Sequence, residues 1–361
     1  MRYRPLGRTG LRVSELFFGA MTFYERGGAD VPREYRAMLD AYADAGGNVV
    51  DTASAYGESE EILGELLAGR RDRFVVATKY TLSRDRDDPN AAGNHRKNLT
   101  LSLERSLRRL RTGHIDLYWV HVWDRHTPVE ETMRALDDAV RAGKILYVGV
   151  SNAPAWLVSR ANTLAEWRDW TPFAGLQVPY NLLRRDVERE LLPTAEAFGM
   201  SVAAWGPLAG GVLSGKFTGR AATEGAVEGV PAGDSTERVT AGDAEAARAT
   251  RVDPGSLTAR DHAVAGAVRE VAGDLGVTPA QVAIAWTRAR SPAVHPIIGA
   301  RNVEQLTDNL GAAGVVLPGG AVRRLESATG FEVGYPGDFI AECEASAQVF
   351  GRSPTEPRVR S

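Results

Sequence analysis

The sequence predicts an α/β fold: a (β/α)8 TIM barrel with an N-terminal hairpin and a long late insertion. Eight short apolar runs alternate with amphipathic stretches whose apolar residues recur at three- and four-residue spacing. Strands that alternate with helices predict a parallel sheet, and eight such units favour a closed barrel. The chain contains no Gly-x-Gly-x-x-Gly turn, which argues against an open dinucleotide-binding sheet.

The elements follow in order along the chain. Glycine-rich turns in residues 6–13 predict a small hairpin. We expect strands at residues 16–21, 48–51, 74–79, 115–122, 145–151, 174–178, 201–205 and 294–299. We expect helices at residues 32–45, 99–111, 129–142 and 187–198, from Glu58 onward, and after the eighth strand. Residues 218–260 are poor in large apolar side chains, so we expect a mobile insertion in a single domain that covers residues 1–361.

Composition narrows the class of protein. A net charge of −3 gives no electrostatic argument for nucleic acid or for an acidic membrane surface. Cys343 is the only cysteine, so neither an intrachain disulfide nor a thiolate metal cluster is expected. The first residues lack the apolar core of a signal peptide and no run is long enough to span a bilayer, so we expect a cytoplasmic protein. Its oligomeric state stays open.

Four polar side chains are expected at one end of three successive strands. Asp51 ends the second strand, Tyr56 lies in the loop beyond it, Lys79 ends the third strand, and His121 lies near the end of the fourth. The carboxyl ends of barrel strands meet at one face, which is where barrel enzymes carry their chemistry. We expect Lys79 to lower the pKa of the Tyr56 phenol, Asp51 to hold Lys79, and His121 to orient a carbonyl oxygen. Each residue alone has an ordinary structural explanation; packing alone does not readily bring all four together.

The second half of the chain predicts a binding site for a flat ligand near this proton donor. Ser151, Asn152 and Gln177 follow or end strands, and Trp205 ends the seventh strand. Neutral hydrogen-bonding groups beside an aromatic plane suit a flat heterocycle that carries a carboxamide.

Two further stretches predict anion binding. Residues 210–217 approach a phosphate-binding loop, but Phe217 stands where Ser or Thr would bind Mg²⁺, which excludes nucleotide hydrolysis and leaves Gly210 and Lys216 suited to a diphosphate. A helix begins after the eighth strand with Arg301 at its start, which suits a phosphate monoester. No metal site is expected.

These residues resemble the aldo-keto reductase superfamily, and residues 93–97 and 187–193 resemble its bacterial aryl-alcohol-dehydrogenase-like branch. The resemblance runs from about residue 3 to residue 317. Its motifs are Asp51-x-x-x-x-Tyr56-Gly, Lys79, His121, Ser151-Asn152, Gln177, Trp205-Gly-Pro-Leu and Gly299-x-Arg301-x-x-x-Gln305-x-x-x-Asn309.

The resemblance implies a barrel that binds NADPH across its mouth, with Tyr56 as general acid. It implies that Arg301 contacts the 2′-phosphate; because Ala300 stands where some members have a hydroxyl or a lysine, use of NADH stays open. It also implies that Gln305 and Asn309 contact the adenosine end. The residues expected to contact the cofactor are Ser151, Asn152, Gln177, Trp205, Pro207, Leu208, Gly210, Lys216, Gly299, Arg301, Gln305 and Asn309.

We therefore expect an NADP(H)-dependent oxidoreductase that reversibly reduces a small aldehyde or ketone. Two alternatives stay open: a reductase of nucleotide-linked keto or enoyl deoxysugars, and a cofactor-binding redox sensor with little turnover. A carboxylate-based barrel hydrolase would need a second acid opposite Asp51, and the sequence offers none at the strand ends. The expected walls of the substrate pocket are aromatic: Phe23, Tyr24, His95, Trp123 and Trp156.

Overall fold

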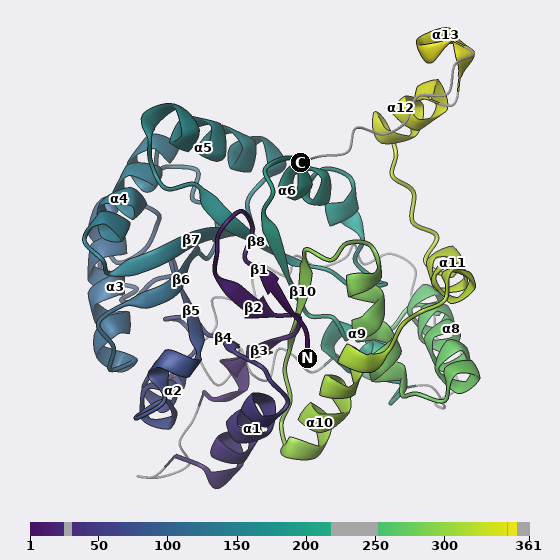
Figure 1. Cartoon of the computed structure of the whole chain (residues 1–361), viewed down its shortest axis with the longest axis horizontal. Helices are drawn as coiled ribbons and strands as arrows, with labels where there is room; N and C mark the ends of the chain where they lie inside the picture. Colours follow the sequence, from purple (N-terminus) through teal and green to yellow (C-terminus); the bar gives the residue numbers. More distant parts are fainter. Residues whose placement is uncertain (25–30, 218–251, 345, 352–361) are drawn as a thin grey trace.

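Eight parallel strands close into a barrel, as the sequence predicts. The computed structural model describes residues 1–24, 31–217, 252–344 and 346–351. The strands follow the order β10-β3-β4-β5-β6-β7-β8-β9 around the barrel, with helices outside them (Figure 1). Their bounds are β3 Phe17–Gly19, β4 Val49–Asp51, β5 Val75–Tyr80, β6 Ile115–Val120, β7 Ile145–Ser151, β8 Phe173–Pro179, β9 Ser201–Trp205 and β10 Val294–Ile298.

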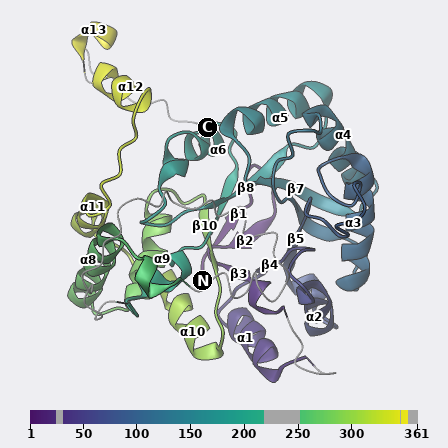
Figure 2. The same ribbon diagram turned by 180° about the vertical axis from the view of Figure 1, so that it is seen from behind.

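Helices follow the strands and cover the outside of the barrel. The α-helices are α1 Arg33–Asp44, α2 Ser59–Leu66, α3 Arg96–Arg109, α4 Val129–Arg141, α5 Ala155–Arg168, α6 Leu191–Ala197, α8 Ala259–Leu275, α9 Pro279–Ala289, α10 Val303–Gly311, α11 Gly319–Ser327, α12 Gly337–Glu344 and α13 Ala347–Phe350. Short 3-10 helices are η1 Ala20–Thr22, η2 Arg71–Arg73, η3 Asp186–Glu188, η4 Ala209–Ser214, η6 Pro254–Ser256 and η7 Ala312–Gly314. In both views α12 and α13 extend away from the barrel (Figures 1 and 2).

One expected helix is wrong. Residues 187–198 do not form one continuous helix, because η3 ends at Glu188 and α6 begins only at Leu191. Pro193 explains the late start, since proline has no N–H and its ring would clash with the carbonyl of residue 189 in a helix that began earlier. The preceding turn is held instead by a buried ion pair, in which Arg185 Nε donates to Glu188 Oε1 at 2.7 Å.

One large ring, that of Trp119, lies in the barrel interior in a buried apolar cluster with Phe17, Val49 and Leu117. Trp119 of β6 is fully buried and lies beside Gly149 of β7 and Gly175 of β8. A Cβ atom added at Gly149 would lie 2.3 Å from Trp119 Cζ3, and one at Gly175 would lie 2.9 Å from Cη2. The two glycines on neighbouring strands therefore provide the space for the indole, which lies in the interior as bulky side chains do in such barrels.

The predicted hairpin closes the amino end of the barrel. β1 (Tyr3–Pro5) pairs antiparallel with β2 (Arg12–Ser14). Its turn lies against the starts of β8 and β9, because the Gly7 N–H donates to Ser201 Oγ at 2.8 Å and a Cβ at Gly7 would lie 2.4 Å from Ala174 O. This leaves the opposite end, where the strands finish, as the mouth of the barrel.

The predicted insertion falls largely outside the described residues, since residues 218–251 are not among them. The described part begins again with η6 and then α8, which starts with a capping box between Thr258 and Asp261. Among the described residues, no helix combines the length and the hydropathy needed to cross a bilayer.

A buried histidine near the amino end makes the fold sensitive to acid. His295 of β10 is fully buried, stacks on Phe17 with ring centroids 4.9 Å apart, and has Nδ1 3.2 Å from Ser14 O. Burial lowers the pKa of His295 to about 4. The unfolded chain therefore binds a proton at this side chain at a higher pH than the folded chain does.

We predict that His295→Leu reduces the loss of stability in acid. The contribution of neutral His295 is fully present above the unfolded pKa of about 6.5 and is lost as the pH falls towards 4, at about 1.4 kcal/mol per pH unit. Urea unfolding at pH 7.5 and pH 5 should show that the native chain loses about 2 kcal/mol more than the variant. Equal losses in the two proteins would contradict this assignment.

Candidate active site

The four predicted polar residues meet at the mouth of the barrel. Asp51 is the last residue of β4, Lys79 lies near the end of β5, and His121 directly follows β6. Tyr56 lies in the loop between β4 and α2. Three neighbouring strands thus deliver an acid, an amine and an imidazole to one place, and the loop after β4 adds the phenol.

Lys79 and Asp51 form a buried ion pair. Lys79 is fully buried, and its Nζ donates to Asp51 Oδ2 at 2.5 Å and to Thr52 O at 2.7 Å. Burial acts to lower the pKa of Lys79, but the Asp51 carboxylate and Tyr56 outweigh it and raise that pKa above its usual value. Lys79 is therefore a charged ammonium in a site where an unpaired charge would be costly.

Tyr56 lies beside this ammonium. Lys79 Nζ is 5.0 Å from the centroid of the Tyr56 ring, and the Tyr56 side chain is half-buried. We expected the ammonium to lower the pKa of the phenol, and it acts in that direction. Burial is the larger effect, however, so the pKa of Tyr56 is raised overall. Lys79 therefore acts as expected, but it does not outweigh burial, and the phenol is protonated at neutral pH.

His121 completes the group as a neutral imidazole. Its ring meets the Tyr56 ring edge to face, with centroids 5.8 Å apart and planes at 83°. Burial, with a smaller contribution from the Lys79 charge, lowers the pKa of His121 to about 3. Nδ1 is buried and has no hydrogen-bond partner among the described residues. At neutral pH the ring carries one N–H and no charge.

Gln177 supports Asp51. Its Nε2 donates to Asp51 Oδ1 at 3.0 Å, so this donor, which we expected to hold a carboxamide, holds the acid of the ion pair. Asn152 is also engaged, because its Nδ2 donates to His121 O at 2.9 Å. Ser151 is buried and its Oγ has no hydrogen-bond partner in the described part of the chain. Of these three, Ser151 is the one whose side chain makes no hydrogen bond within the described residues, whereas Gln177 and Asn152 each donate one and keep the rest of the amide uncommitted.

The end of β9 presents an aromatic plane next to a glycine-rich turn. Trp205 is 37% exposed at the mouth. Pro207 is buried and Leu208 half-buried as η4 begins, and Gly210 and Gly211 of η4 have φ values of 65° and 93°. Such values favour glycine, because a Cβ is strained there. This turn leaves backbone groups accessible beside the indole.

Lys216 and Arg301 form a cationic pair of side chains. Lys216 Nζ donates to Gly210 O at 3.4 Å, and a Cβ at Gly211 would lie only 2.4 Å from Nζ. Burial and the neighbouring Arg301 charge lower the pKa of Lys216. Neither cation has an acidic partner within 4.0 Å in the segments that the structure describes. Two positive charges that interact and have no carboxylate within 4.0 Å among the described residues suit the binding of an anion.

The start of α10 is ordered by its own side chains. Gln305 Oε1 accepts from the Arg301 N–H at 3.1 Å, Asn302 caps the helix by accepting from the Gln305 N–H, and buried Asn309 donates to Gly299 O at 3.2 Å. We did not predict Glu34 of α1, whose Oε1 accepts from the Val303 N–H at 2.7 Å. Only the closed barrel brings α1 against α10, so no local pattern in the sequence indicates this contact.

Of the expected aromatic walls, Tyr24, His95 and Trp123 lie in loops on the mouth side of the barrel, and Trp156 lies in the first turn of α5. Trp123 and Trp156 meet edge to face with centroids 5.2 Å apart, and Trp156 is 56% exposed. Tyr24 is half-buried near the loop of Tyr56, since its carbonyl accepts from the Glu58 N–H. His95 caps α3 by accepting from the Asn98 N–H.

Phe23 lies elsewhere. It is fully buried in the layer between barrel and helices, where it stacks on Tyr35 with centroids 4.3 Å apart and meets Phe18 edge to face. Phe18 and Tyr35 thus pack against the ring from two sides. We therefore leave Phe23 out of the pocket considered below.

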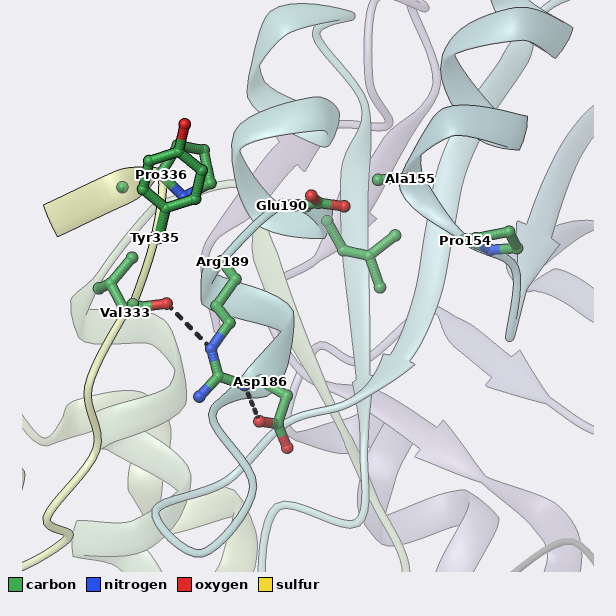
Figure 3. Close-up of a pocket in the computed structure, with 11 residues that line it drawn as sticks. Pro154, Ala155, Asp186, Arg189, Glu190, Val333, Tyr335 and Pro336 are labelled. Atoms are coloured by element: carbon green, nitrogen blue, oxygen red, sulfur yellow. Dashed lines mark hydrogen bonds and ion pairs between the residues drawn. The ribbon is translucent and has the colours of Figure 1, made fainter. Parts of the chain in front are cut away.

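The structure contains a cavity that the sequence analysis did not predict. A cavity of about 290 Å³ lies between the start of α5, the segment around η3 and the chain before α12. Figure 3 shows the residues that line it. Arg189 crosses it, pairing with Asp186 and donating from Nε to Val333 O at 3.0 Å. The cavity is not lined by Asp51, Tyr56, Lys79 or His121. It is therefore separate from the group of four.

Comparison with known proteins agrees with this geometry. The family described as "Aldo/keto reductase family" matches residues 15–329. Norsolorinic acid reductase stcV of Emericella nidulans is 39% identical over 346 residues, covering 92% of this chain and 82% of that protein. Aldo-keto reductase ausK of Aspergillus calidoustus is 37% identical over 356 residues, covering 94% and 85%.

An aryl-alcohol dehydrogenase of Pestalotiopsis microspora is 33% identical over 352 residues, covering 94% of this chain and 85% of that protein. The similarity to these proteins thus extends over the whole barrel, and the matched family covers both the strand ends with the buried ion pair and the start of α10. The chain belongs to the aldo/keto reductase family of oxidoreductases, whose members act on small carbonyl compounds.

Proposed function

We propose that this protein reversibly reduces aldehydes or ketones to alcohols with NADP(H), and that Tyr56 is the general acid. The observation that carries the proposal is the charged, buried Lys79–Asp51 pair beside a protonated phenol. The neutral imidazole of His121 meets the ring of that phenol edge to face. These groups suit the transfer of a proton to a carbonyl oxygen.

Tyr56 gives its proton to the oxygen of the substrate. Because its pKa is raised, the phenol holds its proton at neutral pH and is in the form that reduction requires. The Lys79 ammonium stabilises the phenolate that is left behind, and Asp51 keeps that ammonium charged and fixed. General-acid assistance of this kind typically contributes about 10²- to 10⁴-fold in rate.

His121 orients the carbonyl without competing for the proton. With a pKa of about 3, it is neutral across the working range and can donate one hydrogen bond from its N–H. A neutral donor places the oxygen near Tyr56 while the acid remains the phenol. This division of roles follows from burial, which disfavours the imidazolium.

The residues at the mouth fit a dinucleotide. When bound, NADPH supplies the hydride. The buried and unpartnered Ser151 Oγ suits a carboxamide, and the exposed face of Trp205 suits stacking on a flat ring. The turn at Gly210 and Gly211 suits close approach of a diphosphate.

The cationic pair of Lys216 and Arg301 suits a phosphate beyond that diphosphate. Glu34 already occupies the Val303 N–H at the start of α10, so an anion there depends on the side-chain cations more than on the helix end. NADPH carries an extra phosphate that these cations could bind and NADH does not, so the arrangement favours NADPH.

The substrate that we propose is a flat aromatic carbonyl compound. Relatives of this chain are described as an aryl-alcohol dehydrogenase and as a norsolorinic acid reductase. The edge-to-face pair of Trp123 and Trp156 offers such a compound an aromatic wall on the mouth side, and Tyr24 and His95 lie in the loops after β3 and β5. An NADPH-oxidation assay with aromatic aldehydes, α-dicarbonyls and keto-sugars tests this choice.

We predict that Tyr56→Phe lowers kcat for carbonyl reduction by about 10²- to 10⁴-fold, because the proton donor is lost. The dissociation constant of NADPH, measured by fluorescence titration, should stay close to that of the native protein. Tyr42→Phe is the matched control: it removes a buried hydroxyl that donates to Leu16 O or Val49 O, and should lower stability while leaving kcat intact. Retained turnover in Tyr56→Phe would remove the phenol from the acid role.

We predict that Arg301→Ala weakens NADPH binding about 10- to 100-fold, which corresponds to the loss of a charged hydrogen bond. NADH binding should change much less. Arg8→Ala, on the exposed hairpin at the opposite end of the barrel, serves as a control with no expected effect on either cofactor. Equal weakening of NADPH and NADH would argue against a contact with the extra phosphate.

Glu34→Gln should have the opposite effect. It removes a negative charge beside the Val303 N–H and so should tighten NADPH binding a few-fold without a comparable gain for NADH. The same fluorescence titrations measure it, and weaker NADPH binding in this variant would contradict the proposed position of the anion.

A further inference from the structure

We propose that Asn94 is a positioning residue for the reaction. Its carboxamide joins the end of β5, which carries Lys79, to the chain just after His121. The inference rests on the proposed function, since it concerns the distance between the amine–phenol pair and the imidazole in that reaction.

All the polar groups of Asn94 are engaged. The side chain is buried, and Nδ2 donates to Thr81 Oγ1 at 2.9 Å and to Val122 O at 3.1 Å. Oδ1 accepts from the Asp124 N–H at 2.6 Å. The backbone N–H donates to Asp124 Oδ2 at 3.1 Å, and the backbone carbonyl accepts from the Tyr80 hydroxyl at 3.2 Å.

These contacts flank two of the four site residues. Lys79 is followed by Tyr80, the last residue of β5, and then by Thr81; after β6, Val122 directly follows His121. Asn94 contacts both places with one amide group. A shift of this amide would move the end of β5 relative to the imidazole.

The local backbone is held in a conformation that it would not adopt alone. Thr81 has φ 110°, in the region where a side chain is strained. The Asn94 amide and the Gly93 N–H, which donates to Thr81 O at 2.8 Å, hold it there. Gly93 is required too, because a Cβ there would lie 2.8 Å from Asp124 Oδ2. Strain that is held by specific bonds is typical of functional sites.

Asp124 anchors the far side of this contact. Burial acts to raise the pKa of Asp124, but hydrogen bonds from Thr127 and from the N–H groups of His126 and Asn94 outweigh it and lower that pKa. The carboxylate therefore stays charged and keeps the turn after Trp123 fixed. The backbone of His121 is also held from the neighbouring strand, because Asn152, which follows β7, donates to the His121 carbonyl.

A second buried asparagine provides a matched comparison. Asn162 of α5 is equally buried and also bonds the backbone through its amide, with Oδ1 accepting from the Phe173 N–H at 2.9 Å. It lies where β8 begins, at the amino end of the barrel. The two residues share their chemistry and their burial, and only Asn94 lies between the strand ends of the site.

A structural role and a positioning role predict different kinetics. Misplacement of reacting groups by about 1 Å can cost about 10²-fold in rate even when the change lies away from the chemistry. A purely structural amide would lower the stability of the fold and leave kcat of the folded molecules unchanged. A positioning amide lowers kcat while cofactor binding stays intact.

The test compares Asn94→Ala with Asn162→Ala in the full-length protein. Urea unfolding, NADPH fluorescence titration, and kcat and KM with an aromatic aldehyde are measured for each at a temperature where both are folded. Both variants should lose stability. Asn94→Ala should lower kcat at least 10-fold with the NADPH dissociation constant within about 3-fold, while Asn162→Ala keeps kcat within 2-fold. Unchanged kcat in Asn94→Ala, or an equal fall in both, would overturn the inference.

Thr81→Gly decides the question if Asn94→Ala fails to fold. Glycine relieves the strain at φ 110° and removes the hydroxyl that Asn94 contacts, so stability should be kept while kcat falls several-fold. An unchanged kcat in a folded Thr81→Gly would overturn the inference in that case. Turnover of the native protein is measured first: its absence would overturn the proposed function and this inference together, whereas native turnover with unchanged variants would overturn this inference alone.

Discussion

The site depends on one buried ion pair. An ammonium with no exposure to solvent needs a partner, and Lys79 has Asp51 at 2.5 Å and the Thr52 carbonyl at 2.7 Å. Removing one member of such a pair typically costs about 3–5 kcal/mol, because the other charge is left buried alone. The pair therefore fixes the ends of β4 and β5 relative to each other, and Gln177 extends the connection to β8. In the proposed reaction, the same charge that requires this support stabilises the phenolate of Tyr56.

The barrel separates stability from chemistry along its axis. At the amino end, the hairpin, Ser201 and His295 form a closed, well-bonded base, and Trp119 lies in the middle against two glycines. At the carboxyl end, the loops carry strained and partly accessible groups such as the turn at Gly210. Loops on a rigid scaffold can hold strain because the strands beneath them do not move.

Periodicity in the sequence was enough to predict the barrel and the place of the four polar residues. All eight strands lie within or next to the predicted ranges, since parallel strands buried on both faces read as continuous apolar runs. The end of a strand can be located along the sequence, because the apolar run stops there. Asp51, Lys79 and His121 could therefore be assigned to strand ends. The break before α6 was missed because the amphipathic spacing of residues 187–198 was weighed without Pro193, which prevents the helix from beginning earlier.

Contacts between distant segments could not be predicted in the same way. The sequence indicated Gln177 as a ligand-binding amide, but not that its Nε2 donates to Asp51, 126 residues away along the chain. Glu34 reaches the start of α10 only because the barrel closes. The pKa of Tyr56 depends on a balance between the burial of its side chain and the charge of Lys79. The extent of that burial cannot be read from the sequence.

The central claim is that the charge of Lys79 acts directly on the phenol of Tyr56. Titration of Tyr56 by ¹³C NMR of the labelled phenol carbon, in the native protein and in Lys79→Met, tests it most directly. The account predicts that the native phenol keeps its proton through neutral pH and that its pKa rises further in Lys79→Met, since the ammonium is the group that lowers it. An unchanged or lower pKa of Tyr56 in Lys79→Met would contradict the account.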